Sequence, residues 1–71
     1  MTNINFIPVE SSNILSVGYE EETSSLYVKY PSGTYKYNGV DKSVYESFLT
    51  SPSKGRFMNE NIKGQYNYSR I

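Results

Sequence analysis

The sequence predicts a small, single-domain α+β protein, in which a three-stranded antiparallel β-meander is followed by two short helices packed on one face. Three observations predict this class. The chain has only 71 residues, apolar residues alternate in three runs separated by tight-turn residues, and the apolar spacing becomes helical after Asp41. Because helices follow the strands instead of alternating with them, the class is α+β. We expect residues 1–71 to form one domain.

In the first expected strand, Leu15, Val17 and Tyr19 share an apolar face that should point toward the core. Pro31 and Gly33 favour a tight turn between the second and third strands. Two further segments stay open: residues 6–9 suit an edge strand or a cover over the core, and residues 65–71 suit a strand or a packed arm. The three expected strands span residues 12–20, 25–30 and 34–40.

Helical spacing predicts the two helices. Val44, Tyr45, Phe48 and Leu49 form an apolar stripe on the first helix, which should end near residue 51, before a proline. Either Asp41 or a Ser43–Glu46 capping box is expected to start it. The second helix should begin at Ser53 and end at Gly64. Its expected apolar side consists of Phe57, Met58, Asn61 and Ile62.

The composition excludes several kinds of site. The chain has no cysteine and no histidine, so disulfides and imidazole or thiolate zinc sites are impossible. The usual nucleophiles and bases of covalent catalysis are missing as well. We therefore expect no enzyme activity, no metal and no cofactor. The first residues lack a signal-peptide pattern, and no apolar run reaches the ~20 residues that span a bilayer, so we expect a cytoplasmic protein without a membrane partner.

Charge is unevenly distributed although the net charge is zero. Residues 1–28 hold four glutamates and no basic residue, a net charge of −4. Residues 29–71 hold all seven lysines and arginines and three acids, a net charge of +4. An anionic partner is therefore expected to bind the C-terminal part. The alternative is that these charges only solvate exposed faces.

Two segments carry residue types suited to a nucleotide-like anion. Residues 35–37, Tyr-Lys-Tyr, interleave rings with a cation. Residues 53–56, Ser-Lys-Gly-Arg, place two cations and a hydroxyl at an expected helix start, where anions are favoured. Each candidate residue also has a purely structural explanation. The tyrosines would be core residues, the serine an N-cap, and the cations solvated side chains. The amide of Asn59 would bond to the backbone. The candidate ligand-binding residues are Tyr35, Lys36, Tyr37, Ser53, Lys54, Arg56, Asn59 and Lys63.

Over residues 9–71 the chain resembles the KTSC domain, a short module named after the C-terminus of some lysyl-tRNA synthetases that also occurs alone in small bacterial and phage proteins. Met58 departs from the family pattern, which usually has Phe there, and Asn61 and Gln65 make this copy less basic. The resemblance implies RNA binding, through association with a tRNA-charging enzyme. It depends on Ser11, Ser12, Gly18, Tyr19, Gly33, Thr34, Tyr35, Lys36, Tyr37, Gly39 and Val40, and on Ser53, Lys54, Gly55, Phe57, Asn59, Ile62 and Lys63.

Two functional hypotheses follow. The first is a non-catalytic module for RNA or a nucleotide-like anion, bound by Lys36, Lys54, Arg56 and Lys63 with Tyr35 or Tyr37 as a stacking platform. The second is a protein-interaction module, such as a phage accessory factor that binds a host protein, because tyrosine is enriched at interfaces. Its tyrosines would equally suit a homo-oligomer. Clustering of Lys54, Arg56 and Lys63 beside an exposed tyrosine would favour the first hypothesis.

Overall fold

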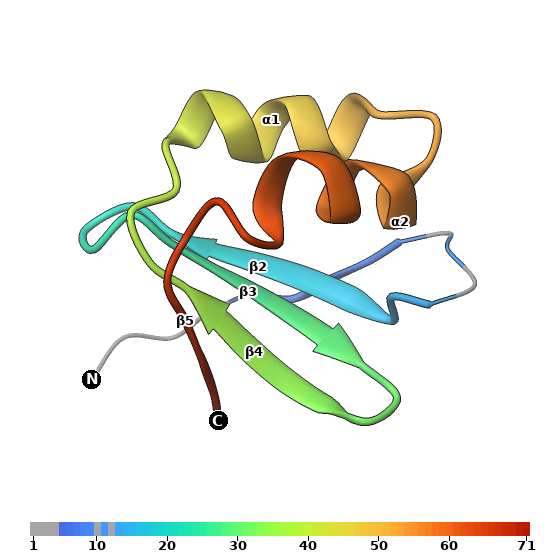
Figure 1. Ribbon diagram of the computed structural model, residues 1–71, viewed down its shortest axis with the longest axis horizontal. Helices are drawn as coiled ribbons and strands as arrows, with labels where there is room; N and C mark the ends of the chain where they lie inside the picture. The colour runs from blue at the N-terminus through green and yellow to red at the C-terminus, as the bar shows by residue number, and fades with distance from the viewer. Residues whose placement is uncertain (1–4, 10, 12) are drawn as a thin grey trace.

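The computed structural model describes residues 5–9, 11 and 13–71, which form a five-stranded antiparallel sheet with two helical segments (Figure 1). The first helix is α1 (Lys42–Thr50). The second, α2 (Lys54–Phe57), continues directly into one π-helical segment, η1 (Met58–Ile62). The strands are β1 (Ile7–Pro8), β2 (Ser16–Glu20), β3 (Ser25–Tyr30), β4 (Gly33–Tyr37) and β5 (Tyr68–Arg70).

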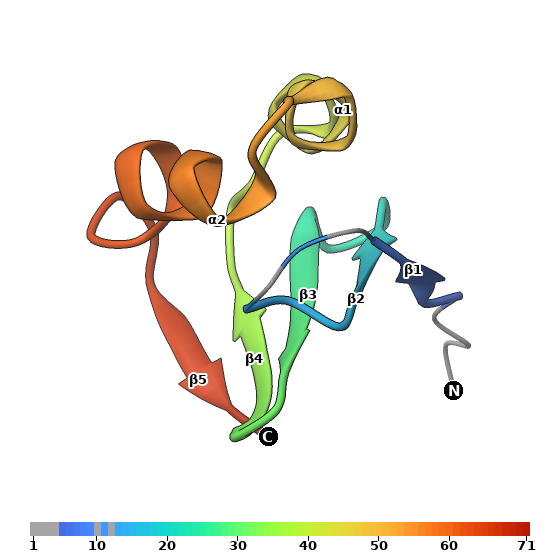
Figure 2. The same ribbon diagram turned by 90° about the vertical axis from the view of Figure 1, so that its right-hand side faces the viewer.

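The strands lie side by side in chain order, from β1 to β5, and the helices lie on one side of the sheet (Figure 2). The α+β class is confirmed, but the expectation of three strands is wrong. The two additional strands, β1 and β5, have two and three residues, and all of these residues are exposed. Such short, exposed segments show no apolar alternation, so only their pairing with β2 and β4 reveals them.

A bulge at the start of β2 changes which residues enter the core. Leu15 donates its backbone N–H to the carbonyl of Lys29 at 2.8 Å, and Ser16 also lies opposite Lys29 in the strand register. Two residues facing one is the arrangement of a β-bulge, which shifts the alternation by one position. Ile14 is therefore buried with Val17, and Leu15 is exposed, contrary to the expected face.

One apolar cluster joins the sheet to the helices. The sheet contributes Val17, Leu26, Val28 and Tyr37, whose alternating positions place them on one face. Phe48 from α1 is fully buried against this cluster, and the rest of the predicted stripe packs around it, which confirms the helical prediction. The other buried members are Ile14, Val40, Met58 and Ile62.

The helix starts differ in detail from the expectation. Asp41 and Ser53 occupy the two N-cap positions, but neither side chain makes a capping hydrogen bond. The Ser43–Glu46 capping box is therefore wrong. The C-terminal helical segment ends at Ile62, and Gly64 follows with φ +79°, a conformation that glycine adopts readily. Neither α1 nor the α2–η1 segment has the length and apolar character that a membrane-crossing helix requires.

Candidate functional site

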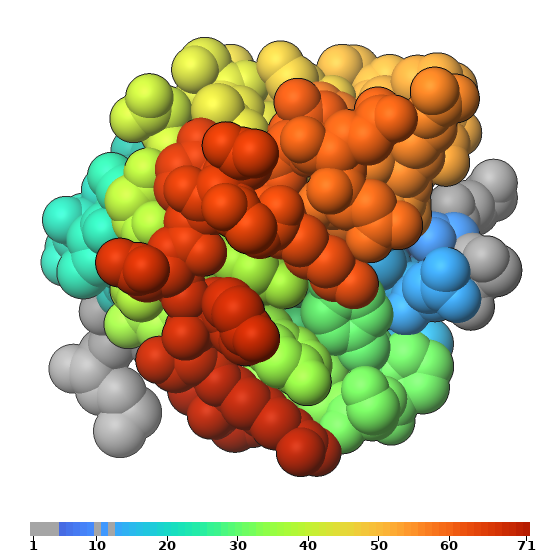
Figure 3. Space-filling view, viewed as in Figure 1, coloured from blue at the N-terminus to red at the C-terminus, as the bar shows by residue number. Residues whose placement is uncertain are grey.

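A groove follows the α2–η1 segment, between this segment and the strands. We call its three parts the polar end, the middle and the tyrosine pocket, with volumes of about 350, 150 and 520 Å³. Asn13, Gly55 and Asn59 line both the polar end and the middle, and Tyr30 and Lys63 line both the middle and the tyrosine pocket. The shared residues place the three hollows next to one another along the segment. Figure 3 shows this face, where the orange and red C-terminal segment stands over the green β3–β4 hairpin.

The polar end gathers four of the predicted binding residues. It is lined by Ser53, Lys54, Arg56 and Asn59, together with Ser11, Asn13, Pro52 and Gly55. Residues from about two helical turns reach one hollow because α2 runs without a break into η1. The π-helical hydrogen bonding of η1 is rare and is found frequently at functional sites. The polar end thus brings these four residues together at one hollow.

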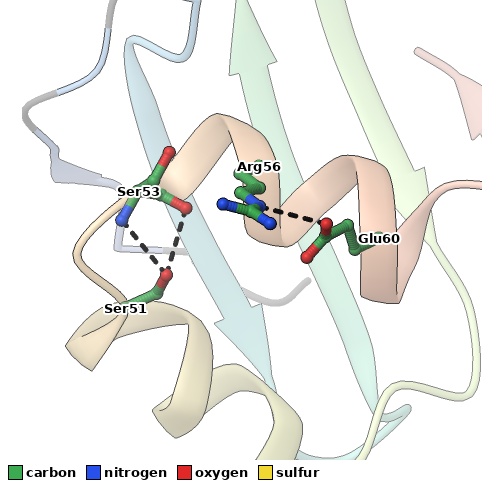
Figure 4. A network of polar contacts seen from close by, with 4 residues as sticks. All are labelled: Ser51, Ser53, Arg56 and Glu60. Carbon is green, nitrogen blue, oxygen red and sulfur yellow. Dashed lines mark hydrogen bonds and ion pairs between the residues drawn. The ribbon is translucent and has the colours of Figure 1, made fainter.

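Hydrogen bonds fix the approach to this helix (Figure 4). The Ser51 hydroxyl donates to the Ser53 carbonyl at 3.0 Å and accepts the Ser53 N–H at 3.3 Å. Lys54 Nζ donates to the Ser51 carbonyl at 2.6 Å. Arg56 Nε lies 3.0 Å from Glu60 Oε2, an exposed ion pair one helical turn apart. Ser51, rather than Ser53, therefore satisfies the backbone at this turn.

Gly55 lies beside the loop before β2, at a distance that a Cβ atom would fill with ordinary contacts. A Cβ atom at Gly55 would lie 3.8 Å from Asn13 Nδ2 and 3.9 Å from Ser11 Oγ. The Ser11 hydroxyl accepts the Asn13 N–H at 3.3 Å, which orders the loop. Ser11 thus lines the polar end, whereas Ser12 lies outside the described residues.

Four tyrosines build the other end of the groove. The rings of Tyr30 and Tyr35 meet edge to face with centroids 5.5 Å apart, and the Tyr68 ring lies 5.7 Å from Tyr35 and 5.5 Å from Tyr37. Tyr37 is almost fully buried and Tyr35 is half-buried, whereas 58% of Tyr68 is exposed. The Lys63 ammonium lies 5.3 Å from the centroid of the Tyr30 ring. Tyr37 is therefore a core residue that also lines the pocket, and Tyr68 forms its accessible wall.

Burial controls the ionisation of these tyrosines. It raises the pKa of Tyr30 well above the ordinary value of 10.0, and the neighbouring Tyr37 hydroxyl raises it further. Burial also raises the pKa of Tyr37. The Tyr30 hydroxyl oxygen is buried, and no group in the described part of the chain forms a hydrogen bond with it. Both hydroxyls, protonated at neutral pH like other tyrosines, therefore also resist ionisation in alkaline solution.

Lys36 lies apart from the other candidates. It pairs with Tyr27 in the strand register, and its ammonium lies 5.7 Å from the centroid of the Tyr27 ring. Tyr27 packs against Phe6 and lies on the sheet face opposite Tyr37, because neighbours along a strand point to opposite faces. The expected single surface that combined Lys36 with the tyrosines on either side is therefore absent.

The charges around the groove are mainly positive. Lys54, Lys63 and Arg70 form no ion pair with any residue that the structure describes. Arg70 instead donates to the Ser32 carbonyl at 2.6 Å, beside the tyrosine pocket. The acidic turn after β2 lies at the other end of the sheet (Figure 1), where Glu21 pairs with Lys42 at 2.6 Å. The charge asymmetry of the sequence is thus preserved in space.

Sequence reasoning missed several residues that line the groove. Tyr30 continues the alternation of Leu26 and Val28, so its face was predictable, although its place at a pocket was not. Tyr68 belongs to a strand too short to show a period. Asn13 lines the groove through the loop before the bulge, and no motif signals it.

Comparison with known proteins gives consistent matches. The family model for the KTSC domain matches residues 10–66. A protein of Stutzerimonas stutzeri, named only as uncharacterised, is 37% identical over 67 residues, which cover 92% of this chain and 94% of its own length. The crystal structure of a KTSC domain protein from Yersinia pestis superposes with a TM-score of 0.94 at 37% identity, over 97% of this chain and 99% of that one.

A longer protein carries a similar segment. A lysine–tRNA ligase of Nostoc punctiforme is 36% identical over 63 residues, which cover 87% of this chain. The chain spans only 11% of the length of that ligase. The similarity therefore concerns one segment of the enzyme, and the enzyme's activity does not pass to this chain with it.

Proposed function

This chain belongs to the KTSC domain family, and from that premise we propose that it is a non-catalytic module that binds single-stranded RNA in the groove along α2 and η1. The groove supports this function because Lys54, Arg56 and Lys63 line it together and it ends in a pocket of tyrosine rings. Proteins that bind single strands combine a basic track for the phosphates with aromatic side chains on which bases stack. Both components are present on this one face.

The distribution of charge favours an anionic partner in spite of the zero net charge. The Lys54 and Lys63 ammonium groups have no acidic partner among the residues described, and only Arg56 is paired, with Glu60 at 3.0 Å. Phosphates near these cations would meet little opposing charge, since the acidic turn lies at the far end of the sheet. The Asn59 amide and the Ser53 hydroxyl offer further hydrogen bonds to a sugar–phosphate backbone.

The lysine–tRNA ligase relative also favours RNA among anions, because a segment like this chain occurs in a protein named for a tRNA substrate. That support is associational, whereas the groove supplies the physical support. The absence of catalysis is part of the proposal. Lys54 Nζ donates a hydrogen bond to the Ser51 carbonyl. This lysine is therefore not placed to act as a general base for the adjacent Ser53 hydroxyl.

The test is a titration of isotope-labelled protein with a short single-stranded RNA, followed by amide chemical shifts. If three cations contact phosphates, the slope of log K against log salt should be about −2, which is about a twentyfold loss of affinity between roughly 50 and 200 mM salt. Shifts are expected at residues 53–64 and at Tyr68. Lys63→Ala should weaken binding several-fold, whereas Lys29→Ala, a matched change of an exposed lysine on the opposite face, should not.

Binding that is absent at the lower salt concentration, or that Lys29→Ala weakens as much as Lys63→Ala, would contradict an RNA site in this groove. The titration has a duplex arm of the same sequence. Tighter binding of the duplex would also contradict the proposal, because stacked and paired bases cannot reach the tyrosine rings.

The open edge of β5 supports a second candidate, a protein partner or a second copy of this chain. The Ile71 N–H donates to the Thr34 carbonyl of β4, and the Asn67 carbonyl accepts the Asn38 N–H directly after β4. Backbone groups alternate in direction along an antiparallel strand, so those of Tyr68 and Arg70 point away from the sheet. An extended segment could pair with them. Light scattering over a wide concentration range tests the homo-oligomer: a constant monomer mass rules it out. The expected role as a phage accessory factor stays a prediction that belongs to this candidate.

A further inference from the structure

The tyrosine pocket has the dimensions of a small-molecule site. Its volume of about 520 Å³ lies within the about 300–1,000 Å³ that such pockets usually have. Four rings line it, and Tyr68 presents an accessible one, because 58% of this residue is exposed in the free protein. Gly64 also lines the pocket and adds no side chain to it. A flat ring therefore has a stacking wall in this pocket.

A buried donor lies beside this pocket without an acceptor. The Tyr30 hydroxyl has no partner at ordinary hydrogen-bond geometry in the described part of the chain, although the neighbouring Tyr37 hydroxyl is close enough to raise its pKa. Buried polar groups in this state are uncommon enough to require an explanation. Like any tyrosine hydroxyl whose pKa is 10 or higher, it is protonated at neutral pH. The hydroxyl therefore offers one hydrogen bond to an acceptor that enters the pocket.

Lys63 lies over the ring of this tyrosine in the free protein. Its ammonium lies 5.3 Å from the centroid of the Tyr30 ring, and the residue lines both the pocket and the middle of the groove. No described acid pairs with Lys63. A phosphate at the rim would attract the ammonium more strongly than the ring does. Movement of this one flexible side chain would uncover the face of the Tyr30 ring that the ammonium now lies over.

From these contacts we propose that the tyrosine pocket receives one unstacked nucleobase, which lies against Tyr68 and accepts a hydrogen bond from the Tyr30 hydroxyl, while Lys63 turns from the Tyr30 ring to the phosphate of the same nucleotide. This inference rests on the proposed function and deepens it. It makes the ligand a nucleotide whose base is free of stacking, in a single strand, in a loop or at an end. A free nucleotide offers the same chemistry, so the experiment must separate the two sources.

The first arm uses small probes. A nucleoside 5′-monophosphate should shift the amides of Tyr30, Lys63 and Tyr68, and ribose 5-phosphate, which lacks the base, should not. Tyr30→Phe should weaken the mononucleotide about five- to tenfold, in line with the loss of one hydrogen bond. The same change should leave folding stability unchanged or increased, because the hydroxyl has no partner to lose. Tyr45→Phe, the matched change on α1, which lines none of these hollows, should alter neither quantity.

The second arm tests the movement of Lys63. Lys63→Ala removes the phosphate contact and also uncovers the ring. It should weaken the mononucleotide several-fold and leave the uncharged nucleoside bound as well as before, or better. If both ligands weaken equally, Lys63 only supports the pocket, and the proposed movement is wrong.

The third arm separates this inference from the proposed function. A short RNA should bind more tightly than the same RNA in which every base is replaced by an abasic position. If both bind equally, with steep salt dependence and no shifts in the pocket, the base site is overturned and the phosphate groove stands. If the mononucleotide binds and no RNA does, the RNA function is overturned and the source of the ligand is a free nucleotide. If neither binds, both are overturned.

Discussion

Gly33 lies directly beneath the Arg70 side chain at the turn between β3 and β4. Its φ is +151°, in a region that residues with a side chain rarely adopt, and a Cβ atom there would lie 2.8 Å from Arg70 Nε. Arg70 in turn bonds to the Ser32 carbonyl at 2.6 Å. One glycine thus allows both the tight turn and the attachment of β5 to it.

We therefore expect Gly33→Ala to reduce the free energy of unfolding by about 1–3 kcal/mol, because it strains the backbone and displaces Arg70. Urea denaturation measures this change. Ser32→Ala, in the same turn, is the control: it keeps the carbonyl that Arg70 uses and should alter stability by less than about 0.5 kcal/mol. Equal effects of the two changes would mean that the turn, rather than the glycine conformation, is sensitive.

Single residues also show where prediction from sequence reached its limit. The face of Tyr37 was predictable, since alternation places it with Leu26, and both are buried. The face of Leu15 was not, because a bulge is a property of the strand pair and leaves no mark on the alternation of one strand. Alternation along β4 places Tyr35 and Tyr37 on the sheet face that lines the tyrosine pocket, and it places Lys36 between them on the opposite face.

At the scale of secondary-structure elements, helical spacing predicted α1 and the second helix well, because a long stripe of apolar residues must face the core. Of the four predicted cations, Lys54 and Arg56 lie on α2 and Lys63 directly after η1, whereas Lys36 lies on β4. The two edge strands lie outside the predicted meander, although residues 6–9 and 65–71 each suit a strand among other conformations. Their pairing depends on the finished sheet, which sequence patterns do not contain.

Helix α2 also permits a test that sets stability against binding. Gly55 has a helical conformation, and a Cβ atom would make ordinary contacts at 3.8 and 3.9 Å. Gly55→Ala should therefore raise the free energy of unfolding by up to about 1 kcal/mol through helix propensity. It should also weaken RNA binding, because the methyl group occupies the floor shared by the polar end and the middle of the groove.

Thermal unfolding and the RNA titration together check this prediction. Ser47→Ala on the exposed side of α1 is the matched control, since it improves helix propensity away from the groove. Stabilisation by Gly55→Ala with unchanged affinity would indicate that the ligand does not touch this floor.

At the scale of the whole molecule, the buried tyrosines make stability depend on alkaline pH. Burial raises the pKa values of Tyr30, Tyr37 and Tyr45 in the folded state above the ordinary value of 10.0. As the pH rises through this value, the unfolded chain releases these protons first and then binds fewer protons than the folded protein. The free energy of unfolding should therefore be steady below about pH 9 and fall progressively above about pH 10.

Urea denaturation at a series of pH values, with tyrosinate absorbance recorded in parallel, measures this fall. Tyr45→Phe removes one of the three groups while Tyr30 and Tyr37 remain, so its stability should decline less steeply above about pH 10. An identical slope for the variant would mean that burial of Tyr45 does not contribute to the alkaline sensitivity.

The order of strands in the sheet has a consequence for how the chain folds. The ladders from β1 to β4 each join neighbouring stretches of chain, so their closure entropy is small and they can form early. The β4–β5 ladder instead pairs Tyr35 with Arg70 and Tyr37 with Tyr68, across both helices. We expect this long loop to close late, and Tyr68 to reach its place in the sheet in the same step. The wall on which a base would stack is therefore among the last parts of the molecule to be assembled, after the rest of the fold exists to receive it.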